Sequence, residues 1–256
     1  MDCAAYPKVC PWPRENYHTR YASYVPHIAK LIPRRNHSWV EITTSCGKSI
    51  KLPLGDVPHT IQPGEQVESS AWQVLCQKSE YAQLYDKAVR ALGRREQFAR
   101  ELKQKLMLKS QDSELIERVI AHCEERGYLD EKRAAEQLVY KFADRGGVGI
   151  QRVKSELFRC GCPAELIPWA LDLAEELIDE TSVLDRLLDS RRKAFQTKLA
   201  RLRNAKTDGL TPAQAKRQIS QKLSTSVMTF LMGRGFKSGP CRSKVRELVD
   251  EILNED

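Results

Sequence analysis

The sequence lacks any apolar run long enough to cross a bilayer, and its first residues, MDCAAYPKVCPWPREN, lack the apolar core of a signal peptide. These absences argue against a membrane protein and against secretion, so we expect a cytoplasmic chain with no membrane partner. In that compartment the eight cysteines are expected to remain reduced thiols instead of forming disulfides.

Motifs that bind metals or phosphate are incomplete as well. The sequence has no CxxC pair, and Cys160 and Cys162 have no second pair nearby, whereas structural zinc needs four ligands at recognisable spacings. The tripeptide Gly47-Lys-Ser resembles the end of a phosphate-binding loop, but the full motif needs a glycine where Ile42 stands. We therefore predict a turn at Gly47, a helix end and restart at Gly146-Gly-Val-Gly149, and no metal or cofactor.

Catalytic side chains are scarce. Four of the five histidines precede residue 60, and the fifth, His122, stands beside Cys123 on an expected helix. A Cys–His nucleophile pair needs orienting partners that the sequence does not identify, so we interpret His122 as a structural residue. No enzyme is predicted, and a cysteine-dependent enzyme is kept as a third alternative behind the two binding functions described below.

What the sequence does contain is a segment that occurs three times. Leu106-Met-Leu-Lys-Ser110, Leu157-Phe-Arg-Cys-Gly161 and Leu231-Met-Gly-Arg-Gly235 are followed by similar residues at matching offsets. These positions are Leu115, Ile116 and Ile120 in the first copy, Leu166, Ile167 and Leu171 in the second, and Pro240, Cys241 and Val245 in the third. The recurrence predicts a mainly α fold with three tandem three-helix (helix-turn-helix-like) repeats in an elongated array.

The residues before this array favour a small N-terminal β unit. Apolar and polar residues alternate over 39–43 and again over 50–54, on either side of the turn Ser45-Cys-Gly-Lys48. Alternation on both sides of a turn predicts a β-hairpin. A short third strand is expected over 28–32, and Pro53 indicates an edge strand because proline cannot donate to a ladder.

The predicted organisation follows from these two patterns. It comprises a loose arm over 1–25, a β-hairpin unit over 26–78, and helical repeats over 79–128, 129–180 and 181–256. Helices are expected over 67–75, 81–93, 95–109, 112–127 and 130–146, then one ending at Cys160, one with Pro163 at its first position, one over 182–205, and two more after a loop at 207–212. Asp112 and Asp130 are the expected N-caps, and Gly127 is the expected helix-ending glycine.

Charge points to an anionic partner. The formal net charge is +8 and the pI is near 9.1, which favours nucleic acid first. One acidic block is expected on the solvent face of the helix after Pro163, and it contains Glu165, Asp172, Glu175, Glu176, Asp179 and Glu180.

Bases recur at equivalent places of the repeats, and the candidate binding residues are Arg94, Arg95, Arg100, Lys103, Arg152, Lys154, Arg159, Arg191, Arg192, Lys193, Lys198, Arg201, Arg234 and Lys237. A stripe of such bases would follow a phosphate backbone or an acidic protein groove, although each base alone is equally well explained as part of a solvated face.

Several of these segments resemble the bacterial RecX regulatory proteins, which modulate the recombinase RecA. The resemblance covers about residues 81–252. It is carried by Arg94-Arg95 before Glu101-Leu-Lys-Gln-Lys-Leu106, the helix over 116–120, Glu125-Arg-Gly-Tyr-Leu-Asp-Glu-Lys-Arg133, Gly149-Ile-Gln-Arg-Val153, and Leu231 to Phe236. Three positions depart from the family: Ser110 replaces a glycine, Ala134 replaces an aromatic residue, and Cys160 replaces a base.

The resemblance implies a monomeric protein that binds RecA filaments on single-stranded DNA and inhibits the recombinase, ATPase and coprotease activities of RecA. It also implies a role in DNA repair, DNA recombination and the SOS response, with weak direct DNA binding. The competing hypothesis is a stand-alone DNA- or RNA-binding module without a RecA partner. Glu114 and Glu165 count against groove reading by that module, because they stand near the starts of the helices expected to enter a groove, where carboxylates repel phosphate.

Overall fold

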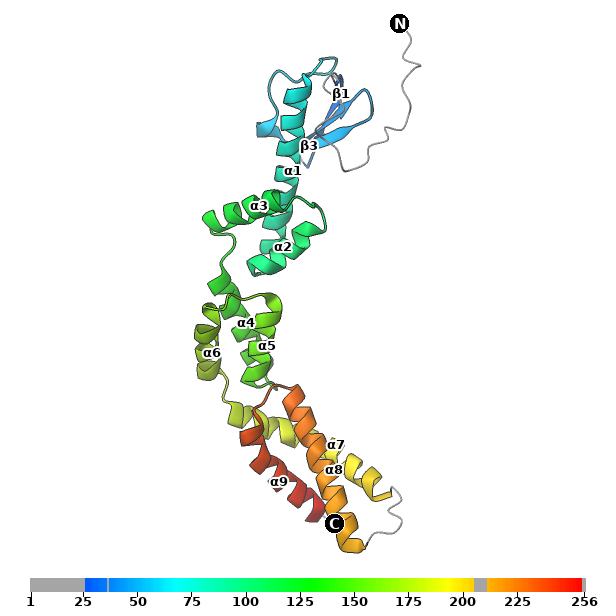
Figure 1. Ribbon diagram of the computed structural model, residues 1–256, viewed down its shortest axis with the longest axis vertical. Helices are drawn as coiled ribbons and strands as arrows, with labels where there is room; N and C mark the ends of the chain where they lie inside the picture. The colour runs from blue at the N-terminus through cyan, green and yellow to red at the C-terminus, as the bar shows by residue number, and fades with distance from the viewer. Residues whose placement is uncertain (1–25, 36, 205–210, 255–256) are drawn as a thin grey trace. The chain divides into compact units, whose positions relative to one another are not determined.

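The computed structural model describes residues 26–35, 37–204 and 211–254 (Figure 1). The chain divides into two compact units, one formed by residues up to 95 together with 102–128, and the other by residues 96–101 together with 129–256. The described residues form a small antiparallel sheet followed by helices, which confirms the mainly α prediction with an N-terminal β unit. None of the described helices is both long enough and apolar enough to cross a membrane.

The sheet has three antiparallel strands in the order β1 (Ile28–Arg34), β2 (Trp39–Thr44) and β3 (Ser49–Pro53). Burial alternates along β2, because successive side chains of a strand point to opposite faces. Gly47 has a φ of +84° in the turn between β2 and β3, which confirms the predicted turn. Pro53 pairs with Trp39 and lies on the edge strand, as predicted.

Helix α1 (Ser69–Leu92) covers this sheet and continues beyond it (Figure 1). The prediction of separate helices over 67–75 and 81–93 was wrong, because the two form one helix. Its buried stripe includes a polar residue, Ser79, which interrupts the apolar pattern in the sequence. The Ser79 hydroxyl donates to the carbonyl of Lys51 at 2.9 Å and accepts from the N–H of Lys51 at 3.1 Å. The serine therefore satisfies the open edge of β3.

Helices α2 (Ala99–Met107) and α3 (Ser113–Glu125) follow α1. The Asp112 carboxylate accepts from the N–H of Leu115 at 2.9 Å, which confirms the predicted N-cap. Helix α2 begins four residues later than expected. Just before it, Phe98 is buried in the apolar core of the following three-helix group. Residues 96–101 therefore pack as part of the second unit.

The second helical group contains α4 (Glu131–Arg145), α5 (Ile150–Cys160) and α6 (Leu166–Leu177). The prediction that Pro163 is the first residue of α6 was wrong. Its carbonyl instead accepts from the N–H of Leu166 at 3.1 Å, so Pro163 opens a turn that precedes the helix. Of the acidic block, Asp172, Glu175 and Glu176 are exposed on α6, whereas Glu165 precedes that helix, Asp179 follows it and Glu180 belongs to α7.

The third group contains α7 (Glu180–Asn204), α8 (Pro212–Gly233) and α9 (Ser238–Asn254), which pack side by side (Figure 1). The predicted apolar stripe of α7 lies in their core, with Leu184, Leu188, Phe195 and Leu199 buried and Leu202 half-buried. Of the predicted loop at 207–212, residues 207–210 lie outside the described residues. Thr211 caps α8 and Pro212 is its first residue.

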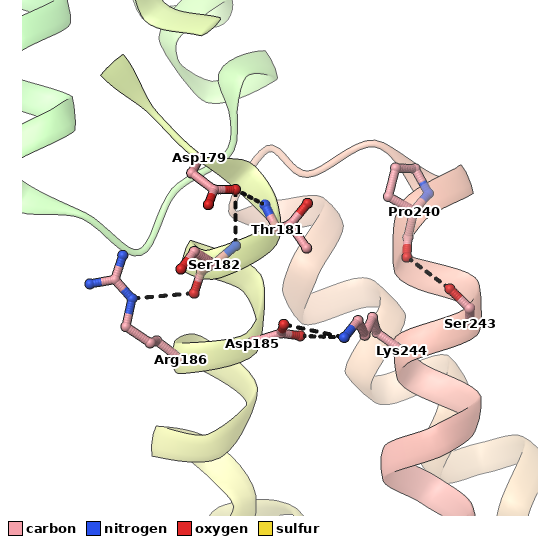
Figure 2. Close-up of polar contacts among 8 residues, drawn as sticks. All are labelled: Asp179, Thr181, Ser182, Asp185, Arg186, Pro240, Ser243 and Lys244. Atoms are coloured by element: carbon pink, nitrogen blue, oxygen red, sulfur yellow. Dashed lines mark hydrogen bonds and ion pairs between the residues drawn. The ribbon is translucent and has the colours of Figure 1, made fainter. Parts of the chain in front are cut away.

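Figure 2 shows the polar contacts that start α7 and join it to α9. The Asp179 carboxylate accepts from the N–H groups of Thr181 at 3.1 Å and Ser182 at 3.2 Å. One turn further on, Asp185 binds the ammonium of Lys244 on α9, with N–O distances of 2.9 and 3.2 Å. Capping by Asp179 sets where α7 begins, and the ion pair joins that helix to α9.

Candidate functional site

The turn before α4 explains why the segment 125–133 has its particular sequence. Gly127 adopts a φ of +67°, and the N–H of Tyr128 donates to the carbonyl of Cys123 at 2.9 Å, which closes the end of α3. Leu129 is buried, and the Asp130 carboxylate accepts from the N–H of Arg133 at 3.0 Å to start α4. The segment thus ends α3 at Gly127, buries Leu129 and starts α4 at Asp130.

The same segment holds residues 96–101 in place. The Arg133 guanidinium donates to both carboxylate oxygens of Glu96, at 2.6 and 3.2 Å, and these bonds raise the pKa of Arg133. Glu131 accepts from the N–H of Ala99 at 3.0 Å at the start of α2. Arg133 is therefore a structural base, because its charge is matched by a bidentate carboxylate.

The second and third helical groups meet through two glycines. The N–H of Gly149 donates to the carbonyl of Arg234 at 3.0 Å, and the N–H of Gln151 donates to the carbonyl of Gly235 at 3.1 Å. A Cβ added to Gly149 would overlap the Gly235 carbonyl, and one added to Gly235 would overlap the backbone of Arg152. The predicted helix restart at Gly149 is confirmed, and two backbones can touch there only because both side chains are absent.

Two of the candidate bases meet at this junction on one aromatic ring. The guanidinium carbons of Arg191 and Arg234 lie 5.7 and 5.4 Å from the centre of the Phe230 ring. Both distances suit a cation–π interaction. Arg191 extends from the apolar stripe of α7 and Arg234 caps α8, so helix packing places two positive charges over a half-buried phenyl group.

Other candidate bases are held by polar partners. Arg159 donates to both carboxylate oxygens of Glu156, at 2.9 and 2.5 Å, and these bonds lower the pKa of that carboxyl group. Arg192 binds Glu251 with an N–O distance of 2.8 Å. Two further pairs are Lys103 with Glu117, and Lys198 with the hydroxyl of Ser226. A paired base is less available to a binding partner, because the existing contact must first be broken.

A third set of bases is exposed. In the described part of the chain, no hydrogen bond or ion pair joins the charged group of Lys193 or of Arg201 on α7 to another side chain. Arg186 lies seven residues before Lys193, nearly two helical turns away, and so on almost the same exposed side. The candidate set missed Arg186, which the helical spacing could have identified. Arg94, Arg95, Arg100, Arg152 and Lys237 are also exposed, and Lys154 is half-exposed.

Comparisons with known proteins identify the family of this chain. Residues 85–123 match the family described as "RecX, first three-helix domain". The "Regulatory protein RecX" of Leptothrix cholodnii is 31% identical over 173 residues, covering 68% of this chain and 93% of that protein. The chain belongs to the RecX family. The "Regulatory protein RecX" of Cronobacter sakazakii is 38% identical over 96 residues, covering 33% of this chain and 56% of that protein. A solved structure described as "Crystal structure of regulatory protein RecX" is 14% identical, with a TM-score of 0.49 and coverage of 88% of this chain and 99% of that one.

The structure describes the surroundings of all three departures of this RecX-family chain. Ser110 is buried, donates to the carboxylate of Glu80 at 2.7 Å and accepts from the N–H of Asp112 at 3.2 Å. The serine side chain thus supplies contacts that a glycine could not make. Ala134 is buried in the core of the second helical group. Cys160 replaces a base and is half-buried beside Arg159. Of these two residues, only Arg159 therefore carries a positive charge.

His122 has the contacts of a structural residue in this RecX-family chain. Its ring shares a hydrogen bond of 2.5 Å with the Tyr81 hydroxyl and stacks on Tyr85 with the ring centres 4.6 Å apart. The neighbouring Cys123 is buried, and this burial raises the pKa of its thiol to about 11. A thiol with that pKa is a poor nucleophile at neutral pH. Sequence and geometry therefore both disfavour a Cys–His pair.

Proposed function

We propose that this protein is a cytoplasmic monomer that binds RecA filaments on single-stranded DNA and inhibits the recombinase, ATPase and coprotease activities of RecA. The observation that carries the proposal is the match to a regulatory protein RecX over 93% of that relative's length. The proposal extends to DNA repair, recombination and the SOS response, because these processes depend on RecA filaments.

Exposed bases on several helices support a nucleoprotein partner. Lys193 and Arg201 on α7 carry charges that no described side chain neutralises, and Arg186 lies on nearly the same side. Charges of this kind neutralise phosphates and release counterions when they bind DNA. The bases that are held by Glu156, Glu117 and Glu251 would contribute less, because each already has a carboxylate partner.

The direct test is the rate of ATP hydrolysis by RecA on single-stranded DNA. We expect the rate to fall as the protein is added, and we expect the protein alone to hydrolyse no ATP. It should also co-sediment with preformed filaments. If excess free single-stranded DNA abolishes all inhibition, the protein competes only for DNA and the stand-alone nucleic-acid-binding function is correct instead.

The role of the exposed bases is tested with two variants of equal net charge. The first carries Lys193→Gln and Arg201→Gln. The second carries Arg34→Gln and Lys244→Gln, and its two bases are paired with Glu41 and Asp185. For single strands the salt slope falls by about 0.7 per lost phosphate contact, so the first variant should lose about 1.4 from the slope of log K against log salt for direct DNA binding.

The second variant is the matched control, and its slope should stay near that of the wild-type chain. Exposed ion pairs stabilise a fold by only about 0–1 kcal/mol, so both variants should remain folded. Equal losses in the two variants would mean that net charge, and not these exposed positions, governs the interaction.

A further inference from the structure

Three large apolar side chains lie exposed at one recurring position. Met107, Phe158 and Met232 are 56%, 52% and 49% exposed. Each is the second residue of the segment that occurs three times in the sequence. Scattered single apolar residues on a surface are ordinary, but an apolar residue kept exposed at the same register of every repeat is not explained by chance placement.

The local structure is similar at the three positions. Each follows a fully buried leucine near the end of its helix: Leu106, Leu157 and Leu231. The carbonyls of these leucines accept from the chain as it leaves the helix. The donors are the N–H groups of Ser110 and Gly161, four residues further on and each at 3.1 Å, and of Phe236, five residues further on at 3.2 Å. The leucine thus anchors the helix end while the next side chain points away from the core.

Other exposed apolar residues do not recur in this way. Leu177 is 42% exposed on α6, and the offsets of the repeat place Arg126 and Glu251 at its equivalents. A position that accepts charge in two repeats needs no apolar side chain. At the Met107 position, by contrast, all three repeats have an apolar residue, although each of these residues is about half exposed.

We propose that Met107, Phe158 and Met232 are one docking contact used three times, each filling an apolar pocket of a protein partner whose subunits repeat along a filament. This inference rests on the proposed function and assigns it a protein-binding surface separate from the exposed bases. Three equivalent side chains need three equivalent pockets, which a polymer of identical subunits provides. Linked contacts of this kind multiply into avidity.

The chemistry of the three side chains selects protein over nucleic acid. Bases of single-stranded nucleic acid stack on aromatic rings, and two of the three residues are methionines without a ring. Methionine is flexible and polarisable, and it is common at protein-docking surfaces that adapt to their partner. The matching site on the partner is therefore an apolar pocket of a protein surface.

The test uses the full chain with the triple substitution Met107→Gln, Phe158→Gln and Met232→Gln. Glutamine forms helices readily, so the exposed positions should tolerate it. The matched control replaces three other exposed apolar residues, Leu54, Val74 and Leu177, by glutamine. Affinity is measured for RecA filaments preformed on single-stranded DNA and, separately, for single-stranded DNA alone, with thermal unfolding as the check on folding.

Each single substitution should weaken filament binding by roughly 5- to 10-fold, as truncation of a central interface residue does, and the triple by roughly 100- to 1000-fold. Affinity for DNA alone should stay within about twofold of wild type, as should both affinities of the control.

If the triple variant binds filaments as tightly as the wild-type chain does, this inference is wrong and the proposed function stands. An equal loss of DNA binding would assign these side chains to nucleic acid, and a change in the monomer mass by light scattering would assign them to self-association. Absence of filament binding by the wild-type chain would overturn the proposed function together with this inference.

Discussion

Single glycines decide where backbones of this protein can touch. Gly161 has a φ of +86°, and a Cβ there would lie 2.6 Å from the Cβ of Arg100. Gly235 combines a φ of +87° with an overlap against the backbone of Arg152. The backbone of Arg152 cannot move aside as a flexible side chain can, so we expect no other residue to fit at Gly235.

Gly235→Ala should therefore lower the free energy of unfolding by at least about 2 kcal/mol, from the left-handed backbone strain and the overlap together. Gly239→Ala is the control, because Gly239 lies in α9 with nothing within 4 Å of an added Cβ and a φ outside the left-handed region. Replacing a helical glycine by alanine should leave stability unchanged or raise it by up to about 1 kcal/mol. Urea unfolding measures both, and equal stabilities for the two variants would contradict the close approach at Gly235.

Buried thiols make stability depend on alkaline pH. Burial raises the pKa of Cys123 and of Cys162 to about 11, from an ordinary value of 9.0. Between these values the unfolded chain loses thiol protons that the folded chain keeps, so the unfolded state gains relative stability as the pH rises. We expect the contribution of both thiols to be complete below pH 9 and to be lost as the pH rises through 11.

Alkylation of the folded protein at pH 8.5 separates these thiols from the exposed Cys46. Mass spectrometry should find Cys46 modified first, with Cys123 and Cys162 modified only when the protein unfolds. Modification of the buried thiols at the rate of Cys46 in the folded chain would contradict the burial that raises their pKa values.

At the scale of elements, side-chain caps set where the helices begin. Asp112 caps α3 and Asp130 caps α4 through their carboxylates. Glu180 serves a helix distant in sequence, because its carboxylate accepts from the N–H of Ile150 at 2.6 Å, at the start of α5. Gly149, the N-cap residue of that helix, has no side chain to do so. The hydrogen bond that caps α5 therefore comes from a distant residue and depends on tertiary structure.

Asp130→Ala should cost about 1 kcal/mol of stability through loss of this cap. Asp130→Asn should cost much less, because an amide oxygen can still accept from the N–H of Arg133. Thermal unfolding of the two variants compares them directly. If the asparagine variant loses as much as the alanine variant, the negative charge near Arg133, 3.8 Å away, matters more than the cap.

At the scale of the whole molecule, the second and third helical groups are not independent. The first turn of α5 donates to the carbonyls of Arg234 and Gly235, which belong to the third group. Val183 packs against the apolar cores of both groups. Removing the third group therefore exposes N–H donors of the second group as well as apolar surface.

A chain that ends at Glu180 should unfold at a lower temperature than residues 1–256 do. In hydrogen exchange, the amides of Gly149 and Gln151 should lose protection, because their acceptors are gone. Retained protection at both amides would show that the second group stands alone. Since the truncation changes stability, the full-length substitutions described above are the cleaner test of how the repeats share binding.

Much of this fold follows from local sequence patterns. The β-hairpin, the buried stripe of α7, the caps at Asp112 and Asp130, and the glycine that ends α3 were all predicted correctly, because period-two and helical spacings and capping preferences act over a few residues. The repeat was visible for the same reason, but the prediction from helical spacing that Met107 is buried was wrong, since the residue is 56% exposed. The family could also be recognised from segments such as 125–133.

Only the tertiary structure decided the rest. The helices predicted over 67–75 and 81–93 form one helix, and Ser79 between them is buried because its hydroxyl bonds to a strand 28 residues earlier. Among the candidate bases, Arg159 and Arg192 are bound by carboxylates, Arg191 and Arg234 share the Phe230 ring, and Lys193 remains exposed. A sequence reports that a charge is present, whereas the availability of that charge depends on which distant side chains packing brings within a few ångströms.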